Sequence, residues 1–565
     1  MTREREVQNA KSILEAIAEA DVISDPLDCL VQNTATDPYA AFRPEIIDGL
    51  VALKSEDPEA FEVLRADLKE AGCRVCALDE AMNNEEGAKG RSPTQADILI
   101  SLPGIVQLFH SPDGRAFAEL RIGDHRETLP VRKKEFRAWL SRKFYEQTQS
   151  VPNSEALKRA IDLIEAKAIH DGPELPVFIR VGSFEERLYL DLADEAWRAV
   201  EIRADGWQVV DELPINFIRP AGMKPLPIPE QGGSIDALRS FLNVNSDDDF
   251  VLVVSWALAA LRNLAPYPVV VLSGEQGSAK STFSAVLRSL LDPNTAPLRA
   301  LPREERDLYI AASNGHVLAF DNVSQLPSWM SDALCRLASG GGFAIRQLYT
   351  DQDEVLFDFS RPVVLNGIED IISRPDLADR AILLTLEAIP ESRRRPEAEF
   401  WAKFEDERPR ILGALLDATA MGLKMLPYTK LDGLPRLADF ALWATACEPA
   451  FWAKGTFEEA YSNNLDDTVD NVIEADPVAT AICDLVAKRT TWRGTATELL
   501  SELSRLAGDR TSRSKNWPVS PKVLSNRLRR AATFLRKAGI ETHHSKEGRA
   551  RTRIIAISKK EDPPC

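Results

Sequence analysis

The sequence predicts a multi-domain protein with an α/β core, an α+β region before the core and a small basic domain near the C-terminal end. Three observations support this prediction. At 565 residues the chain exceeds the usual length of one domain, and a hydrophobic content of 44% is sufficient for packed cores. An apolar strand runs into a glycine-rich loop near residue 274. Finally, acidic regions are followed by a strongly basic tail.

Changes in composition and periodicity divide the chain into six predicted regions. These are a helical acidic N-terminal region (1–90), an α+β region (91–218), a Pro-rich linker (219–233), an α/β core (234–395), a helical lid or bundle (396–475) and a basic domain (476–560). In the α+β region, strand-like Ile105–His110 and Phe117–Ile122 flank a turn, and no catalytic constellation stands out. Proline and glycine in Arg219–Gly233 are typical of a linker.

The composition also excludes some classes of protein. No apolar run reaches the roughly 18–20 residues that cross a bilayer, and the longest candidate is Phe250–Leu261. The N-terminal sequence MTREREVQNAK lacks the apolar region of a signal peptide. Seven dispersed cysteines do not form a disulfide framework. We therefore expect a soluble, cytoplasmic protein that has no membrane partner.

Residues 267–282, YPVVVLSGEQGSAKST, form the most informative motif. After an apolar strand, Gly274 and Gly277 let the backbone curl so that its N–H groups face a phosphate chain. The helix that begins near Lys280 adds its positive end, while Lys280 offers a charge to the β- and γ-phosphates and Ser281 a ligand to Mg²⁺. We therefore expect ATP and Mg²⁺ to bind here. The predicted nucleotide-binding residues are Gly274, Glu275, Gln276, Gly277, Ser278, Ala279, Lys280, Ser281 and Thr282.

Ala279 stands where the usual G-x-x-x-x-G-K-[ST] pattern has its second glycine. Alanine is tolerable there if the residue has helical dihedral angles, because alanine is a good helix former. The alternative interpretation of the motif is an ordinary glycine-rich turn between a strand and a helix.

Two further strands end in polar residues that suit the same site. The apolar run Val317–Phe320 leads to Asp321, which we expect to face the metal, and Pro362–Leu365 leads to Asn366. An asparagine in that place can orient the attacking water or sense the γ-phosphate. Taken alone, each of these strand ends is also an ordinary turn.

The ordered motifs GEQGSAKST, HVLAFDN, LASGGGFAIRQLYTDQDE and RPVVLNG resemble those of superfamily 3 helicases, and more narrowly the primase–helicase-type ATPases of phages and integrated elements. The resemblance covers roughly residues 234–464, about 40% of the chain. It implies a P-loop AAA+ core, ATP hydrolysis, a role in DNA replication and a homo-oligomeric ring, with a hexamer expected. It also assigns phosphate and Mg²⁺ binding to Lys280, Ser281 and Asp321, and nucleotide sensing to Asn366.

The resemblance implies a hairpin at Phe343–Phe357 that projects into the channel of the ring, where Arg346 and Tyr349 would contact DNA. The acidic tip at residues 350–353 departs from the basic hairpin expected of a translocase, and a structural hairpin is the alternative.

The resemblance also implies a trans-acting arginine, with Arg380 as the first choice and Arg374 as the second. It would neutralise charge that develops on the γ-phosphate in a neighbouring subunit. An ordinary surface pair between aspartate and arginine is the alternative.

Asn322 follows Asp321 where a second acid is usual. Asparagine can orient water but cannot accept its proton at neutral pH. The candidates for a water-activating acid stay open, and they are Glu275, Glu304, Glu305 and Asp307.

The tail from Lys488 to Lys560 contains 19 lysines and arginines against five acidic residues, which favours a DNA-binding module. Helical 477–488, 496–507 and 521–537, followed by strands 540–544 and 551–557, resemble a winged helix. A winged helix used for protein contacts is the alternative. The predicted DNA-binding residues are Lys522, Arg527, Arg529, Arg530 and Lys537 on the third helix and Arg549, Arg551 and Arg553 on the wing.

Together these features favour an ATP-dependent DNA-binding ATPase that acts as a helicase or replication initiator of a phage, plasmid or integrated element. The alternative is a nucleotide-gated DNA-binding switch or assembly factor, which Asn322 and the acidic hairpin favour. A primase–helicase that retains synthesis is a third possibility, but no residues before Arg219 support a polymerase site.

Overall fold

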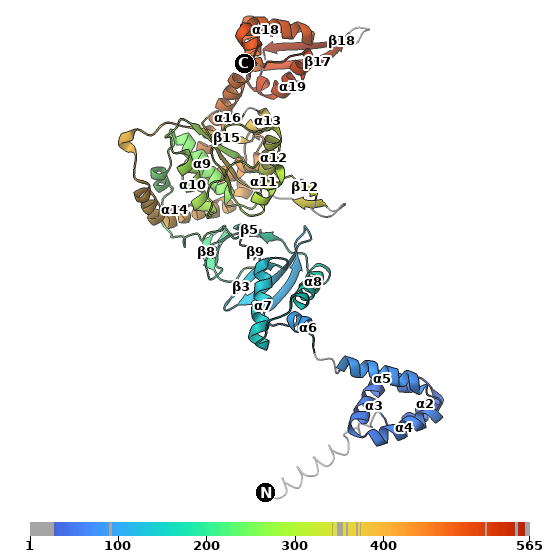
Figure 1. Ribbon diagram of the computed structural model, residues 1–565. Coiled ribbons are helices and arrows are strands. Elements are labelled where there is room, and N and C mark those ends of the chain that lie inside the picture. Colours follow the sequence, from blue (N-terminus) through green and yellow to red (C-terminus); the bar gives the residue numbers. More distant parts are fainter. Residues whose placement is uncertain are drawn as a thin grey trace. The chain divides into compact units, whose positions relative to one another are not determined.

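The computed structural model describes residues 27–89, 93–341, 343–346, 354–357, 360–368, 371–372, 374–514, 517–547 and 552–559. The described chain has a mixed α/β fold, whose elements follow one another from blue to red in Figure 1. It divides into two compact units. One contains the described residues up to Leu102 together with Leu140–Ala160, and the other contains Pro103–Trp139 and the described residues from Ile161 onwards.

The N-terminal region is helical over its described residues, in agreement with its apolar spacing. Its elements are α2 (Leu30–Thr36), η1 (Ala40–Phe42), α3 (Pro44–Glu56), α4 (Pro58–Glu70), α5 (Val75–Lys89) and α6 (Gln95–Ile100). Proline occupies the first turn of α3 and α4, and the Asp57 side chain caps α4 by accepting a bond from the Ala60 amide. Leu50, Phe61 and Leu68 belong to a core that is local to this region.

The next elements confirm most of the predicted α+β pattern. They are β1 (Ile105–His110), β2 (Ala116–Ile122), β3 (His125–Pro130), α7 (Lys134–Thr148), α8 (Ser154–His170), β4 (Val177–Phe178), β5 (Val181–Phe184), β6 (Arg187–Asp191), β7 (Ala199–Arg203), β8 (Gly206–Val210) and β9 (Asn216–Phe217). Strands β1-β2-β3 and β5-β6-β7-β8 form antiparallel sheets, and β4 pairs with β9 in parallel. The sequence analysis missed β3, because its residues HRETLP are mostly polar.

Residues 219–233, predicted to form a linker, are packed along the fold. The Leu226 amide donates to the Leu192 carbonyl, and the Glu230 amide donates to the Pro409 carbonyl. Proline-rich composition restricts helices and strands, but it leaves most carbonyl and N–H groups able to pair with other segments. The segment therefore does not act as a free tether.

The core is built on a parallel sheet with the strand order β11-β14-β10-β15. Its elements are η2 (Ile235–Phe241), α9 (Asp247–Ala260), β10 (Val269–Gly274), α10 (Lys280–Leu291), α11 (Glu305–Ala312), β11 (Leu318–Phe320), α12 (Ser328–Ser339), β12 (Phe343–Arg346), β13 (Glu354–Phe357), β14 (Val363–Asn366), α13 (Pro375–Ala378) and β15 (Ala381–Leu386). The apolar run Phe250–Leu261 forms most of α9, which is buried in this core. Among the described residues, no helix has the length and apolar character of a membrane span.

Helices follow the core, as predicted for residues 396–475. They are η3 (Glu391–Arg393), α14 (Glu397–Met425), η4 (Leu426–Tyr428), α15 (Ala438–Cys447), η5 (Glu448–Ala450) and α16 (Thr456–Ala475). Trp443 is buried and its indole N–H donates to the Leu258 carbonyl at 3.0 Å. Trp401 and Trp452 pack partly buried against the same hydrophobic cluster. The tryptophans of this region therefore belong to core packing.

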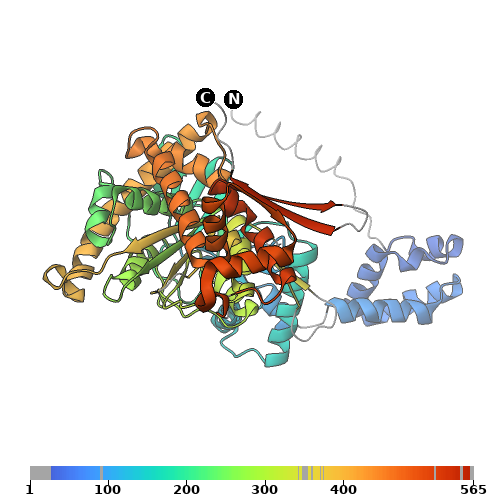
Figure 2. The same cartoon turned by 90° about the horizontal axis from the view of Figure 1, so that it is seen from above.

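The C-terminal domain contains α17 (Pro477–Lys488), β16 (Thr491–Gly494), α18 (Ala496–Ser512), α19 (Pro521–Lys537), β17 (Ile540–Glu547) and β18 (Thr552–Lys559). The Ser520 side chain caps α19, and Leu524, Leu528, Ala531 and Leu535 form its buried face. The sheet order is β16-β18-β17, and the short strand β16 was missed. Figure 2 shows the β17–β18 ribbon (red) extending from the helices of this domain.

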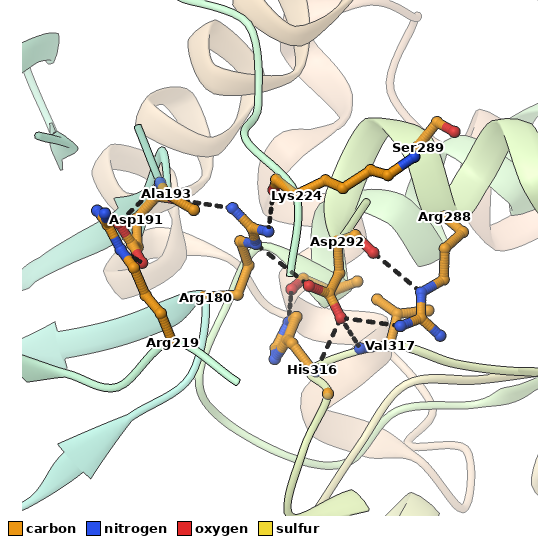
Figure 3. A network of polar contacts seen from close by, with 12 residues as sticks. Arg180, Asp191, Ala193, Arg219, Lys224, Arg288, Ser289, Asp292, His316 and Val317 are labelled. Carbon is orange, nitrogen blue, oxygen red and sulfur yellow. Dashed lines mark hydrogen bonds and ion pairs between the residues drawn. The ribbon is translucent and has the colours of Figure 1, made fainter. Parts of the chain in front are cut away.

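A buried ionic network lies at the C-terminal end of α10 (Figure 3). Asp292 is 1% exposed, and its Oδ1 lies 3.2 Å from Arg180 Nε, while its Oδ2 lies 3.4 Å from Arg288 Nη2. The backbone N–H groups of His316 and Val317 also donate to Oδ2. Arg180 comes from the α+β region, so this network fixes that region to the core.

Burial and the neighbouring charges shift the pKa values of the ionisable groups in this network. Burial opposes ionisation of Asp292 most strongly, but the Arg180 and Arg288 guanidinium groups hold the pKa of its carboxyl below the ordinary value. Burial lowers the pKa of Arg288. Burial and, to a smaller extent, the nearby Arg361 lower the pKa of His316 to about 4. Histidine 316 is therefore neutral at pH 7.

Candidate functional site

The loop after β10 requires both of its glycines. Gly274 has a φ of 145°, and a β-carbon there would lie 2.3 Å from the Leu386 carbonyl oxygen. Gly277 has a φ of 89°, which disfavours residues with a β-carbon. The loop therefore curls as the sequence predicted. Ser278 is buried within it, and its hydroxyl donates to the Glu275 carbonyl at 2.9 Å.

Ala279 does not meet the condition under which alanine is tolerated without strain. The residue precedes α10 with φ 60° and ψ 30°, which is the left-handed region and not the right-handed helical one. The helix α10 begins one residue later, at Lys280. A β-carbon in this conformation lies close to the following carbonyl, at a cost on the order of 1 kcal/mol.

The Lys280 side chain folds back over the loop. Its ammonium group lies 2.8 Å from the carbonyl oxygens of Gly274 and Glu275 and 3.1 Å from Ser278 Oγ. Burial lowers the pKa of Lys280, against an opposing effect of Asp321. Neutral acceptors that bind an ammonium group can be exchanged for stronger anionic ones, such as phosphate oxygens.

The structure brings Asp321 to the loop. Asp321 Oδ1 accepts a hydrogen bond of 3.0 Å from the Ser281 hydroxyl at the start of α10. The two residues are 40 positions apart, and they meet because the carboxyl ends of the parallel strands β10 and β11 face the same edge of the sheet. A hydroxyl and a carboxylate are oxygen donors of the kind that Mg²⁺ accepts.

Asn366 ends the strand between β10 and β11, and its side chain is buried. Its Oδ1 accepts from the Asn322 amide at 3.0 Å, and its Nδ2 donates to Ser284 Oγ at 3.1 Å. Asn366 therefore ties the Asp321–Asn322 strand end to α10. The site couples three elements through this one side chain.

Asn322 has a φ of 55°. Asparagine and aspartate tolerate this left-handed conformation better than other residues with a β-carbon. An asparagine at position 322 therefore suits the backbone conformation, in addition to the water-orienting role considered from the sequence. Among the candidate acids, Glu305 forms an ion pair with Arg336 at 2.5 Å.

A cavity of about 640 Å³ adjoins the loop. Its lining includes Gly277, Ala279 and Thr282 of the motif and the aromatic residues Phe241, Phe283 and Phe400. Three further lining residues, Arg393, Arg394 and Arg395, were not predicted. The available signal was the basic run in ESRRRPE, which begins five residues after the end of β15.

The segment that carries these arginines is tied to the loop. The Ile389 amide donates to the Gly277 carbonyl at 3.1 Å. Asn243 Nδ2 donates to the carbonyls of Ser278 and Glu387, at 3.0 and 2.8 Å. These bonds hold the segment with the arginines and the segment around Asn243 against the loop.

Arg374 and Arg380 lie away from this loop. The Arg380 carbonyl accepts from Val269, the first residue of β10, whereas the loop follows the last residue, Gly274. Arg374 donates to the Ser328 carbonyl and pairs with Asp332, each at 2.8 Å. The Arg380 backbone therefore lies at the edge of the sheet opposite the loop, whereas Arg374 contacts the first turn of α12.

The predicted hairpin is present in part. Strands β12 and β13 pair antiparallel, with Arg346 opposite Glu354. Tyr349 and the acidic tip, residues 350–353, lie outside the described residues. The DNA contacts assigned to the hairpin stay predictions.

The basic tail divides into exposed and engaged residues. Lys522, Arg529, Arg530 and Arg553 are exposed. Two other predicted DNA-binding residues have internal partners: Arg527 Nη2 lies 2.9 Å from Asp476 Oδ1, and Lys537 Nζ lies 2.7 Å from Asp379 Oδ1. Both side chains are engaged in ion pairs in this structure, and their DNA contacts stay predictions. Arg549 and Arg551 lie outside the described residues.

Comparison with known families gives matches for two adjacent parts of the chain. Residues 235–471 match the model of the replication protein of actinomycete integrative conjugative elements. Residues 478–564 match the model of the C-terminal domain of that protein. The core, the following helices and the basic domain are thus similar to a replication protein of a mobile element. A search of curated proteins found no significant match.

Solved structures give distant likenesses. The C-terminal region of NrS-1 in an apo form is 13% identical, with a TM-score of 0.37, and the alignment covers 83% of this chain and 99% of that one. An SCCmec type IV Cch structure, described as an active helicase, is 12% identical, with a TM-score of 0.42, over 80% of this chain and 93% of that one. Such values indicate remote similarity only.

Proposed function

We propose that this protein is an ATP-dependent, DNA-binding AAA+ ATPase that acts as a helicase or replication initiator of an integrated mobile element. The main observation is the Ser281–Asp321 contact of 3.0 Å beside the Lys280 loop. This contact beside Lys280 supports a phosphate-binding loop of the P-loop type, which uses a hydroxyl, a carboxylate and a lysine. The family matches of residues 235–471 and 478–564 support the replication context.

ATP and Mg²⁺ fit the residues at this site. Ser281 and Asp321 would hold Mg²⁺, which neutralises phosphate charge when bound. Lys280 would exchange its carbonyl acceptors for the β- and γ-phosphates. The three phenylalanines of the adjoining cavity suit a nucleobase, and Arg394 suits the phosphates, because its Nη2 lies 3.5 Å from the β-carbon position of Gly277.

Arg380, with Arg374 as second choice, would act on the nucleotide of a neighbouring subunit. The Arg380 carbonyl bonds to the first residue of β10, at the sheet edge opposite the loop, so a head-to-tail arrangement of subunits could bring Arg380 to the loop of a neighbour. Such contacts close into a ring, and we propose a hexamer. The hairpin residues Arg346 and Tyr349 would then face the channel.

The C-terminal domain would bind DNA as a winged helix. Three helices followed by the β17–β18 ribbon support this assignment. Helix α19 buries its apolar face and exposes Lys522, Arg529 and Arg530, which would contact phosphates or bases in a major groove. Arg553 would contact the flanking backbone.

Substitution of Lys280 by alanine tests the ATPase. We expect ATP hydrolysis to fall by at least about 100-fold, because the variant lacks the charge that faces the transferred phosphoryl group. The readouts are phosphate release and strand displacement on a forked duplex, each with and without ATP. Thermal unfolding of the variant provides the control, and hydrolysis at the wild-type rate by the folded variant would refute the site.

Asn322 favours a second candidate function, a nucleotide-gated DNA-binding switch. The residue lacks a proton acceptor at neutral pH, so ATP would control assembly and DNA affinity with little hydrolysis. The same strand-displacement assay separates the two functions. Unwinding that requires Lys280 supports the motor, whereas ATP-dependent changes in oligomer size and DNA affinity without unwinding support the switch.

The DNA-binding surface has its own test. The double variant Arg529→Ala/Arg530→Ala should flatten the dependence of DNA affinity on salt by about two phosphate contacts. Arg410→Ala removes an exposed arginine of α14 and serves as a matched control. An unchanged salt slope in the double variant would contradict the assignment of α19.

A further inference from the structure

One ion pair joins the C-terminal domain to the segment that bears the trans-acting arginine. Lys537, the last residue of α19, places its ammonium group 2.7 Å from Asp379 Oδ1. Asp379 directly follows α13, and its side chain is 10% exposed. Arg436 lies 3.6 Å from the other carboxylate oxygen. Two cations from distant parts of the sequence therefore hold this carboxylate.

The neighbouring residue, Arg380, has a different environment. Its Nη1 donates to the Asp376 carbonyl at 2.7 Å, which is an uncharged acceptor. Its Nε is buried and has no hydrogen-bond partner among the described residues. The adjacent carboxylate, Asp379, already forms ion pairs with Lys537 and Arg436. The positive charge of Arg380 is thus left available to an outside anion.

We propose that Lys537 is a positioning residue that keeps Asp379 from capturing Arg380. The inference rests on the proposed function, in which Arg380 acts on a neighbouring nucleotide. A largely buried carboxylate that loses one cation is destabilised and gains by recruiting another. When Lys537 is absent, the cation next to Asp379 in the chain is Arg380. Pairing with Asp379 would neutralise Arg380 and withdraw it from the neighbouring nucleotide.

Docking of the C-terminal domain would therefore permit hydrolysis in the neighbouring subunit. Helix α19 also exposes Lys522, Arg529 and Arg530, so DNA would act on the same rigid element that ends at Lys537. A helix that moves as one body transmits a displacement at its exposed face to its end. Binding of DNA to α19 would then change the availability of Arg380 to the neighbouring nucleotide.

The test compares ATP hydrolysis by Lys537→Ala with that of Arg536→Ala. Both variants remove one cation from the last turn of α19, but Arg536 is exposed and has no assigned role in binding or catalysis. We expect kcat to fall at least about tenfold in the first variant, with KM nearly unchanged, since trans arginines act mainly on kcat. In Arg536→Ala we expect kcat within about twofold of wild type.

A second substitution distinguishes this effect from a general structural one. In the Lys537→Ala/Asp379→Asn variant the competing carboxylate is absent, so kcat should recover to within about threefold of wild type. Thermal unfolding of each variant verifies folding. Wild-type kcat in Lys537→Ala, or failure of Asp379→Asn to restore it in folded protein, would overturn the inference.

These outcomes separate the inference from the proposed function. If wild-type hydrolysis depends on Lys280 but not on Lys537, the ATPase stands and the positioning role is wrong. If the wild-type protein shows no Lys280-dependent hydrolysis, the proposed function fails, and the positioning role fails with it.

Discussion

The two ends of helix α10 place charged residues in opposite environments. At its N-terminal end, Lys280 contacts uncharged carbonyls of a glycine loop beside a cavity. At its C-terminal end, Arg288 and Asp292 are each 1% exposed and belong to an ionic network. Contacts to uncharged acceptors at an open site can be exchanged for a ligand, whereas buried ion pairs cannot open without desolvated charge being left behind. We call the end of α10 at Lys280 the adaptable end, because its contacts can be exchanged for a ligand. We call the end at Arg288 and Asp292 the locked end, because its ion pairs are buried.

This comparison predicts that substitutions at the locked end change stability and that substitutions at the adaptable end change function. The largest expected effect is that of Asp292→Asn, which leaves the buried Arg180 and Arg288 without a counter-charge. We expect the free energy of unfolding to fall by about 3–5 kcal/mol. Chemical denaturation measures this change, with Lys280→Ala as the control at the adaptable end. A loss below about 1 kcal/mol in Asp292→Asn would show that the network is not locked.

His316 makes the locked end sensitive to pH. Its pKa is lowered to about 4 in the folded chain from an ordinary value of 6.5, so the unfolded chain binds more protons between these values. The contribution of neutral His316 to the free energy of unfolding is fully present above pH 6.5. It decreases as the pH falls toward 4, by up to about 3 kcal/mol. The measurement is denaturation across this range in wild type and His316→Gln. Parallel curves for the two proteins would contradict the prediction.

The substitution Gly274→Ala should disrupt the loop at the adaptable end by a steric clash. The added β-carbon would lie 2.3 Å from the Leu386 carbonyl, at a φ of 145°. We expect a loss of about 1–3 kcal/mol and of nucleotide binding, because the loop must move away from β15. Gly433→Ala is the matched control, since no atom lies within 4 Å of its β-carbon position. Equal stability of the two variants would refute the close approach.

Ala279→Gly gives the smallest expected effect and sharpens the comparison. At φ 60° alanine is strained, so glycine should stabilise the protein by up to about 1 kcal/mol, after allowance for its larger unfolded-state entropy. Urea unfolding measures the difference. Destabilisation by glycine would contradict the strained left-handed conformation of Ala279.

The sequence alone identified most of the elements and the residues of the loop. Its glycines and Lys280 lie within nine consecutive positions, so local chemistry was sufficient to predict their roles. The buried face of α19 was also predictable, because the spacing of Leu524, Leu528 and Leu535 is a local property of a helix. The mostly polar strand β3 and the short strand β16 were missed, since pairing with neighbouring strands forms them.

Only the tertiary structure decided which distant residues meet. The order β11-β14-β10-β15 brings Asp321 to Ser281 and sends Arg380 to the opposite edge. It also decided that Lys537 is paired while Lys522 is exposed, although the sequence presents both as lysines of one helix. The physical reason is that charge pairing depends on distance in space, and the packing of elements far apart in the chain sets that distance.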